Sequence, residues 1–183
     1  MPQKQQKQRL PGFSFEERAS LVYDNNRDYY QTFGDSLLIA IFWEETMFNN
    51  VAQEQGTAVG LGQIEPAELW TLKQYGITTN AKNILNSPAH AVKVTAAYLN
   101  HLYQSQTANP KRRSEALKRY AGYCWDKAAW RLTLIQGWEA CAQALDNISA
   151  PVWSDNPEAL LNALALARGF SKSDPKIRAA LFP

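Results

Sequence analysis

The stretch LLIAIFWEETMFNN, from Leu37 to Asn50, predicts a buried helix that carries two adjacent carboxylates. Because a helix turns by about 100° per residue, Glu45 falls inside the apolar stripe centred on Ile41, and Glu44 falls on its flank. Burial disfavours the carboxylate anion, and the negative end of the helix dipole acts in the same direction, so the pKa of Glu45 should be raised. A protonated glutamic acid suits general acid catalysis, but a structural glutamate paired with an arginine or with backbone groups fits the same pattern.

A glycine-rich loop is predicted directly after this helix. The segment GTAVGLGQIEP, from Gly56 to Pro66, holds three glycines, ends in proline and has room for one short extended piece. Gln63 carries an amide that both donates and accepts hydrogen bonds, so it suits either a sugar's acetamido group or the stabilisation of the loop itself. Gly60 can bring the backbone close to a ligand or serve only to form a turn.

The rest of the chain predicts a mainly α protein with no internal repeat. Residues 1–12 are basic and glutamine-rich and predict a flexible tail. From residue 13 onward, helical periodicity and capping signals continue with breaks at glycine and proline, and no linker divides the chain. The predicted helices span residues 14–34, 36–48, 67–76, 88–106, 114–122, 126–148 and 156–169.

The composition argues against several classes of protein. A length of 183 residues with 45% hydrophobic residues is ordinary for one globular domain, and a net charge of +2 is too small to indicate a nucleic acid partner. No stretch is long and apolar enough to span a membrane. His90 and His101 are too far apart in sequence to suggest a local metal pair, so no metal or cofactor is expected. Cys124 and Cys141 predict two buried thiols, with a single disulfide as the alternative.

The helix that carries Glu44 and Glu45 and the glycine-rich loop after it, in this order, resemble the signature of the soluble lytic transglycosylase family and its lysozyme-like relatives. In that family a helix ends in Glu-Ser followed by an aromatic residue and Asn, and a Gly-Leu-Met-Gln-Ile/Leu-x-Pro loop comes next. Here Glu45–Thr46 matches the first pair, Phe48–Asn49 matches the aromatic residue and Asn, and Gly60–Pro66 matches the loop.

Two weaker elements follow in the family's order, so that the resemblance spans residues 36–123, about half of the chain. Tyr98–Leu99 matches a Tyr-Leu pair, and Tyr120–Gly122 matches a Tyr-Asn-x-Gly segment, although it lacks the Asn and is one residue shorter. Thr46 replaces serine and keeps the hydroxyl. Gly62 replaces methionine, which removes a side chain and should make the loop more open.

The resemblance implies a lysozyme-like fold in which a central helix and the glycine-rich loop line a polysaccharide groove. One domain, residues 13–183, would hold this fold and a helical C-terminal extension. The resemblance selects Glu45 over Glu44 as the catalytic residue, which would protonate the glycosidic oxygen of peptidoglycan and then act as a base. The candidate substrate-binding residues, each with a structural alternative in the loop or core, are Thr46, Gly60, Gln63 and Tyr120.

Two other functions stay open at this point. A hydrolytic muramidase, such as a lysozyme, a phage endolysin or a secreted antibacterial toxin, would usually need a second carboxylate about 5–10 Å away. An inactive peptidoglycan-binding module is the alternative of another class. No spacing selects the second carboxylate among the candidates, which are Glu54, Glu65, Glu68 and Asp126.

The expected setting is the periplasm or the bacterial cell wall. The basic start of the chain is not followed by the apolar segment of a classical signal peptide, so phage lysis or a secretion apparatus would bring the protein there. The expected partners are peptidoglycan glycan strands and, for a toxin, an immunity or inhibitor protein; the protein itself is expected to be a monomer. Trp43, Trp130 and Trp138 are expected in the core rather than on a sugar-binding surface.

Overall fold

The computed structural model describes residues 36–46 and 49–147 of the chain. Within these residues the protein is mainly α, as predicted, and contains helices and isolated bridges but no strand. The predicted tail at 1–12 and the predicted helices at 14–34 and 156–169 lie outside the described residues. The helices are α3 (Leu37–Thr46), the 3-10 helix η2 (Pro66–Tyr75), α4 (Ala81–Asn86), α5 (Pro88–Gln104), α6 (Arg112–Tyr120), α7 (Tyr123–Asp126) and α8 (Ala129–Asp146).

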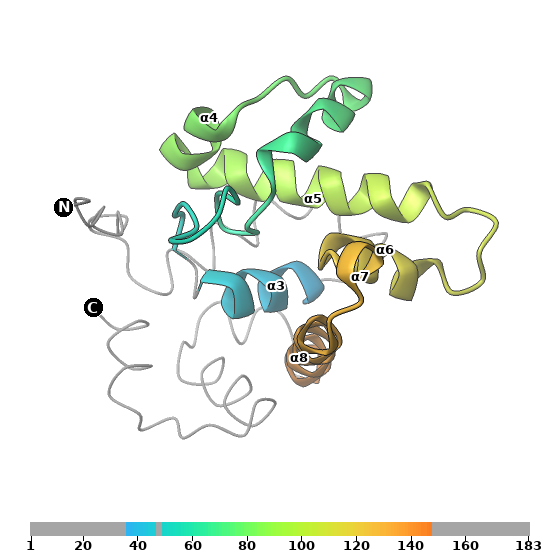
Figure 1. Cartoon of the computed structure of the whole chain (residues 1–183). Helices are drawn as coiled ribbons and strands as arrows, with labels where there is room; N and C mark the ends of the chain where they lie inside the picture. The colour runs from blue at the N-terminus through green and yellow to red at the C-terminus, as the bar shows by residue number, and fades with distance from the viewer. Residues whose placement is uncertain (1–35, 47–48, 148–183) are drawn as a thin grey trace, which may run out of the picture.

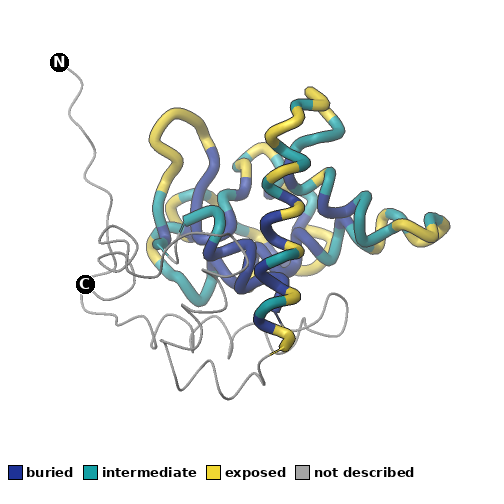
Figure 2. Tube along the Cα trace, turned by 90° about the horizontal axis from the view of Figure 1, so that it is seen from below, coloured by how far each residue is buried: buried dark blue, intermediate teal, exposed yellow. Residues whose placement is uncertain are grey.

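Helix α3 lies in the centre of the hydrophobic core. Every residue from Leu37 to Trp43 is buried, which confirms that this helix is covered on most of its faces. Such a helix is held by tertiary packing more than by its own helix propensity. Helix α8 packs against it, and Figure 1 shows α8 nearly end-on beside α3. Figure 2 shows the buried residues gathered in the middle of the described part, with exposed residues on its loops and along the outer faces of its helices.

Helix α5 supports the elements on the other side of the molecule, because η2, α4 and α6 all pack against it. It begins at Pro88, and the Ser87 hydroxyl accepts a hydrogen bond from the His90 N–H at 3.2 Å. Serine at the N-cap and proline in the first turn are favourable at a helix start. The predicted start at this Ser-Pro pair is therefore confirmed.

Three local elements differ from the prediction. Residues 66–75 form a 3-10 helix instead of an α-helix, although Gly76 ends it as predicted, with a left-handed φ of 71°. Helices α4 and α7 were not predicted, because each covers fewer than two turns and so carries too little periodicity to detect. Asn80 begins α4 by accepting a hydrogen bond from the Asn83 N–H.

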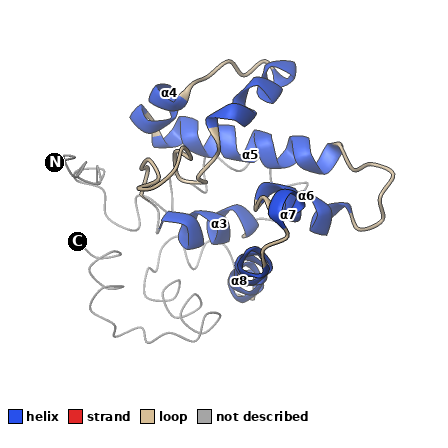
Figure 3. Ribbon diagram, in the orientation of Figure 1, coloured by secondary structure: helices blue, strands red, loops and turns tan. Residues whose placement is uncertain are grey.

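The glycine-rich loop joins α3 to η2 and is drawn in tan in Figure 3. Val59 forms isolated antiparallel bridges with Ala52 and with Ile64, so the short extended piece predicted in this loop is present. The Gly60 N–H also donates to the Val51 carbonyl oxygen at 2.9 Å. The loop therefore folds back on itself and carries Gln63 to the groove that also contains Glu45.

Candidate active site

A groove of about 390 Å³ opens between the end of α3, the glycine-rich loop, η2, α5 and the segment from α6 to α8. It gathers one half-buried carboxylate from the core helix, polar groups from the loop and aromatic side chains from the later helices. The lining residues that the chemistry below uses are Glu45, Gly62, Gln63, Glu65, Glu68, Tyr98, Arg119, Tyr120, Trp125, Trp130 and Arg131.

Glu45 lies at this groove in the last turn of α3. The pKa of its carboxyl group is raised from 4.5 to about 7, mainly by burial and in smaller part by the charge of the neighbouring Glu44. The desolvated carboxylate is disfavoured, so the protonated and ionised forms are both well populated near neutral pH. Glu45 is therefore able to give a proton to a bound ligand and to take one back, as the helix periodicity had suggested.

Glu44 points to a different part of the protein. Its Oε1 accepts a hydrogen bond from the Cys141 thiol on α8, with a distance of 3.3 Å between the two heavy atoms. Glu44 does not line the groove. The two adjacent carboxylates thus have separate surroundings, and only Glu45 faces the space in which a ligand fits. Cys141 is buried as expected, but Cys124 is only half-buried; neither cysteine is in a disulfide.

Thr46 holds the loop rather than lining the groove. Its Oγ1 lies 3.1 Å from the carbonyl oxygens of both Phe42, one turn earlier, and Leu61 in the loop. The hydroxyl group therefore joins the end of α3 to the glycine-rich loop. These contacts fit the structural alternative for Thr46, a bond to the preceding turn, and a role of Thr46 in substrate binding stays a prediction.

Gln63 lines the groove, but its amide group also holds the loop together. Its Nε2 donates to the carbonyl oxygens of Val51 at 3.0 Å and of Gly60 at 2.8 Å. The backbone of Gln63 is in the left-handed region with a φ of 49°, which is unusual for a residue with a side chain. These two hydrogen bonds support that conformation, and they leave Oε1 as the amide atom available to a ligand.

Gly60 belongs to the glycine-rich loop but does not line the groove. Its φ is 84°, and a Cβ atom placed on it would lie 2.6 Å from Cγ2 of Ile84. Glycine is needed here for a left-handed turn and for close packing on α4. The close approach at Gly60 is thus to the protein's own core, which fits the turn alternative, and a contact of Gly60 with substrate stays a prediction.

Tyr120 joins α6 to the loop at Gly62. Its hydroxyl group donates to the Gly62 carbonyl oxygen at 2.6 Å. Burial raises the pKa of Tyr120 well above its usual value, and the nearby charge of Glu45 contributes to the same shift. Tyr120 thus lines the groove together with Glu45, with its hydroxyl group bonded to the loop, and its role in substrate binding stays a prediction.

Gly62 does not open the loop. A Cβ atom at Gly62 would lie 2.5 Å from Cγ2 of Thr95, 2.5 Å from the Tyr120 hydroxyl oxygen and 2.6 Å from Oγ1 of Thr95. Side chains from α5 and α6 fill the space next to this glycine. The expectation of a more open loop is therefore wrong, because two other side chains occupy that space.

The structure separates the four candidates for a second carboxylate. Glu65 and Glu68 line the groove with Glu45, whereas Glu54 and Asp126 do not. Glu65 accepts a hydrogen bond from the Thr57 hydroxyl group, and Glu68 is hydrogen-bonded to Tyr98, a contact that contributes to the raised pKa of that tyrosine. The two candidates for a second carboxylate that line the groove are thus both hydrogen-bonded by protein hydroxyl groups.

The tryptophans divide into core and surface. Trp43 and Trp138 are buried, as expected. Trp130 was expected in the core, but it is exposed and lines the groove together with Trp125. Trp130 is the second residue of α8. At the start of a helix, periodicity does not show whether another part of the protein covers a side chain. The aromatic rim of the groove was therefore missed from the sequence.

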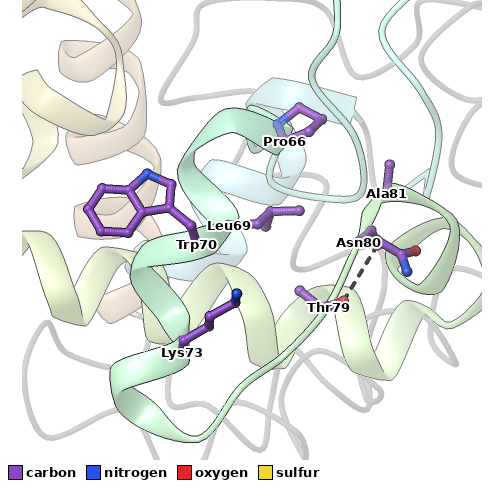
Figure 4. A pocket seen from close by; sticks show the side chains of 7 residues that line it. All are labelled: Pro66, Leu69, Trp70, Lys73, Thr79, Asn80 and Ala81. Carbon is purple, nitrogen blue, oxygen red and sulfur yellow. Dashed lines mark hydrogen bonds between the residues drawn. The ribbon is translucent and has the colours of Figure 1, made fainter.

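A second hollow of about 240 Å³ lies between η2 and residues 79–81 at the start of α4. Figure 4 shows Leu69 and Lys73 on one side of η2 and the Trp70 ring directed away from them. This hollow contains no carboxylate side chain, so it lacks a group that could act as an acid. The groove at Glu45 is accordingly the candidate active site.

Among residues 36–46 and 49–147, no group of three His, Cys, Asp or Glu side chains is placed to hold a metal ion. In that same part of the chain, the helices are too short or too polar to cross a lipid bilayer.

The helical core, the glycine-rich loop and the groove with a half-buried glutamate define a lysozyme-like domain. Comparison with known protein families matches residues 25–128, more than half of the chain, to the transglycosylase SLT domain. The chain therefore belongs to this family, whose members cleave glycosidic bonds of peptidoglycan. Comparisons with curated proteins and with solved structures returned no match.

Proposed function

We propose that this protein is a lytic transglycosylase that cleaves the β-1,4 bond between N-acetylmuramic acid and N-acetylglucosamine in peptidoglycan. The observation that supports this most strongly is Glu45, at the groove with a carboxyl pKa raised to about 7 by burial. A group with this pKa can act as an acid and, after losing its proton, as a base at neutral pH. Since its substrate lies outside the cytoplasmic membrane, the proposed place of action is the periplasm or the cell wall.

In the first step, Glu45 donates its proton to the glycosidic oxygen as the bond from that oxygen to C1 of the muramoyl residue breaks. The leaving sugar departs with a free hydroxyl group. Positive charge develops at C1, and the 2-acetamido group of the same sugar stabilises it. Glu45 is now a carboxylate in a partly desolvated site, where it is a stronger base than in water.

In the second step, the Glu45 carboxylate removes the proton from the C6 hydroxyl group of the same muramoyl residue. The C6 oxygen forms a bond to C1, which closes a 1,6-anhydro ring and restores the protonated Glu45. No water is consumed, and one carboxyl group acts twice. The hydrogen bonds that Glu65 and Glu68 make with protein hydroxyl groups favour this reaction over one that needs a second free carboxylate.

Hydrolysis is the second candidate, because Glu65 and Glu68 do line the same groove as Glu45. Either carboxylate would have to activate a water molecule or attack C1, as paired carboxylates do in glycosidases. An inactive binding module is less consistent with Glu45, since an unreactive groove gains nothing from a carboxyl group that is costly to bury.

Digestion of purified peptidoglycan distinguishes these functions. We expect muropeptides whose muramoyl ends are lighter by one water than the hydrolytic products, because the anhydro ring replaces a reducing end. Mass spectrometry of the fragments, with a hydrolytic lysozyme digest as the reference, makes the comparison. Reducing ends in every product would point to hydrolysis, and the absence of fragments despite binding would leave only a binding module.

A further inference from the structure

Two large aromatic rings that line the groove are exposed. Trp125 in α7 is 83% exposed and Trp130 in α8 is 58% exposed, and both line the groove that contains Glu45. Most tryptophans in proteins bury the greater part of their surface. Trp43 and Trp138 are buried in the described core, and Trp70 is exposed outside the groove, so Trp125 and Trp130 are set apart by being both exposed and at the groove.

The segment between these two tryptophans is held in place by polar contacts. The Asp126 carboxylate accepts hydrogen bonds from the Ala128 N–H at 3.0 Å and from Nε and Nη2 of Arg131, each at 2.9 Å. Arg131 also donates through Nη1 to the Ala121 carbonyl oxygen. Its guanidinium carbon lies 4.4 Å from the centre of the Trp130 ring. This ring is therefore positioned before any ligand arrives, which lowers the entropy cost of binding.

The groove combines this aromatic rim with polar groups from other elements. Glu65 and Glu68 enter it from the start of η2, and Gln63 enters from the glycine-rich loop. A pyranose ring has apolar C–H faces and hydroxyl edges. Aromatic rings pack against such faces, while carboxylates and amides accept or donate hydrogen bonds at the edges.

We propose that Trp125 and Trp130 form a stacking platform for sugar rings of the glycan strand, beyond the residues at the cleaved bond. The inference rests on the proposed function and adds to it, since it assigns recognition of the carbohydrate backbone to the corner between α7 and α8. The platform takes the apolar faces of the sugars and needs no contact with the stem peptides. It holds the strand in the groove while Glu45 acts on the bond.

The test measures binding of glycan strands by a variant that cannot cut them. In a Glu45→Gln background, strands freed of their stem peptides are titrated while tryptophan fluorescence or heat is recorded. We expect Trp125→Ala and Trp130→Ala each to raise the dissociation constant by about tenfold, the size of one good aromatic contact. Trp70→Ala is the matched control, because Trp70 is 71% exposed but lies outside the groove.

Conservative replacements separate loss of stacking from loss of folding. Trp125→Tyr and Trp130→Tyr keep an aromatic face and should retain most of the affinity. Unchanged affinity in both alanine variants would overturn the platform, and so would an equal loss in Trp70→Ala. Effects seen only on strands that still carry stem peptides would assign this corner to peptide recognition and contradict the proposal.

Failure of the platform and failure of the proposed function give different results. If the wild-type protein releases anhydro fragments while the Trp125→Ala and Trp130→Ala variants bind strands normally, only the platform is wrong. If the wild-type protein neither cleaves peptidoglycan nor binds its strands, both are wrong.

Discussion

Replacement of Glu45 by glutamine should lower the rate of peptidoglycan cleavage by roughly three orders of magnitude, since general acid–base catalysis contributes about that much. Glutamine has nearly the same shape but can neither give nor take a proton. The fold should be intact, because the substitution removes a carboxyl group that is disfavoured by burial. Release of soluble muropeptides measures the rate, and the midpoint of thermal unfolding, expected to be unchanged or higher, checks the fold.

Glu44→Gln is the matched control for this substitution. It changes the adjacent residue of the same helix by the same chemical step, but the Glu44 carboxylate contacts the Cys141 thiol and does not line the groove. We expect this variant to keep much of its activity. Full activity in Glu45→Gln would refute the assignment, and equal losses in both variants would mean that the effect comes from damage to α3.

Gly62→Ala should destabilise the protein by about 2 kcal/mol, within the range for overpacking a closely packed site. The added methyl group would lie 2.5 Å from Cγ2 of Thr95 and 2.5 Å from the Tyr120 hydroxyl oxygen. Neither neighbour can withdraw easily, since Thr95 is buried on α5 and the Tyr120 hydroxyl group is bonded to the Gly62 carbonyl oxygen. Unfolding in urea, followed by circular dichroism, measures the loss of free energy.

Two further variants show whether the loss comes from this contact. In Gly76→Ala the new methyl group meets no atom within 4 Å, so this variant should lose only about 1 kcal/mol of stability, from the strain of its left-handed φ of 71°. Thr95→Ala removes two of the three atoms that the new methyl group would strike, so Gly62→Ala should cost less in that background. If the cost is the same with and without Thr95→Ala, packing against α5 is not the reason why Gly62 is glycine.

The sequence was sufficient to place Glu45, because the direction of a side chain on a helix depends on local geometry. The apolar run before it predicted a buried helix, and the 100° step put Glu45 inside the apolar stripe with Glu44 on its flank. The resemblance to the transglycosylase family then selected Glu45 over Glu44 as the catalytic residue. The start of α5 at Ser87–Pro88 and the end of η2 at Gly76 were predictable for the same reason. Each depends on capping and turn residues within a few positions in the chain.

Other parts of the site depend on contacts between segments that are far apart in the sequence. Residue patterns within one segment do not predict such contacts. Gly62 appeared to open the loop, but Thr95 and Tyr120 from two other helices fill the space beside it. The hydroxyl group of Thr46 could have faced either the substrate or the protein, and its bond to the Leu61 carbonyl oxygen depends on how the loop folds back. Trp130 fits a core position by its apolar character alone, and only the packing of its neighbours leaves it exposed.

Direct titration of the Glu45 carboxyl group tests the central claim, that burial raises its pKa to near neutral pH so that it can both give and take a proton. Protein labelled with carbon-13 at the glutamate carboxyl groups is titrated by NMR, and the Glu45 signal is identified by its loss in Glu45→Gln. We predict a pKa of about 7, lowered in Glu44→Gln because the neighbouring charge is gone. The acid form is then present below pH 7 and is lost as the pH rises through that value, so cleavage should fall with it. A pKa near 4.5, the ordinary value, would contradict the account.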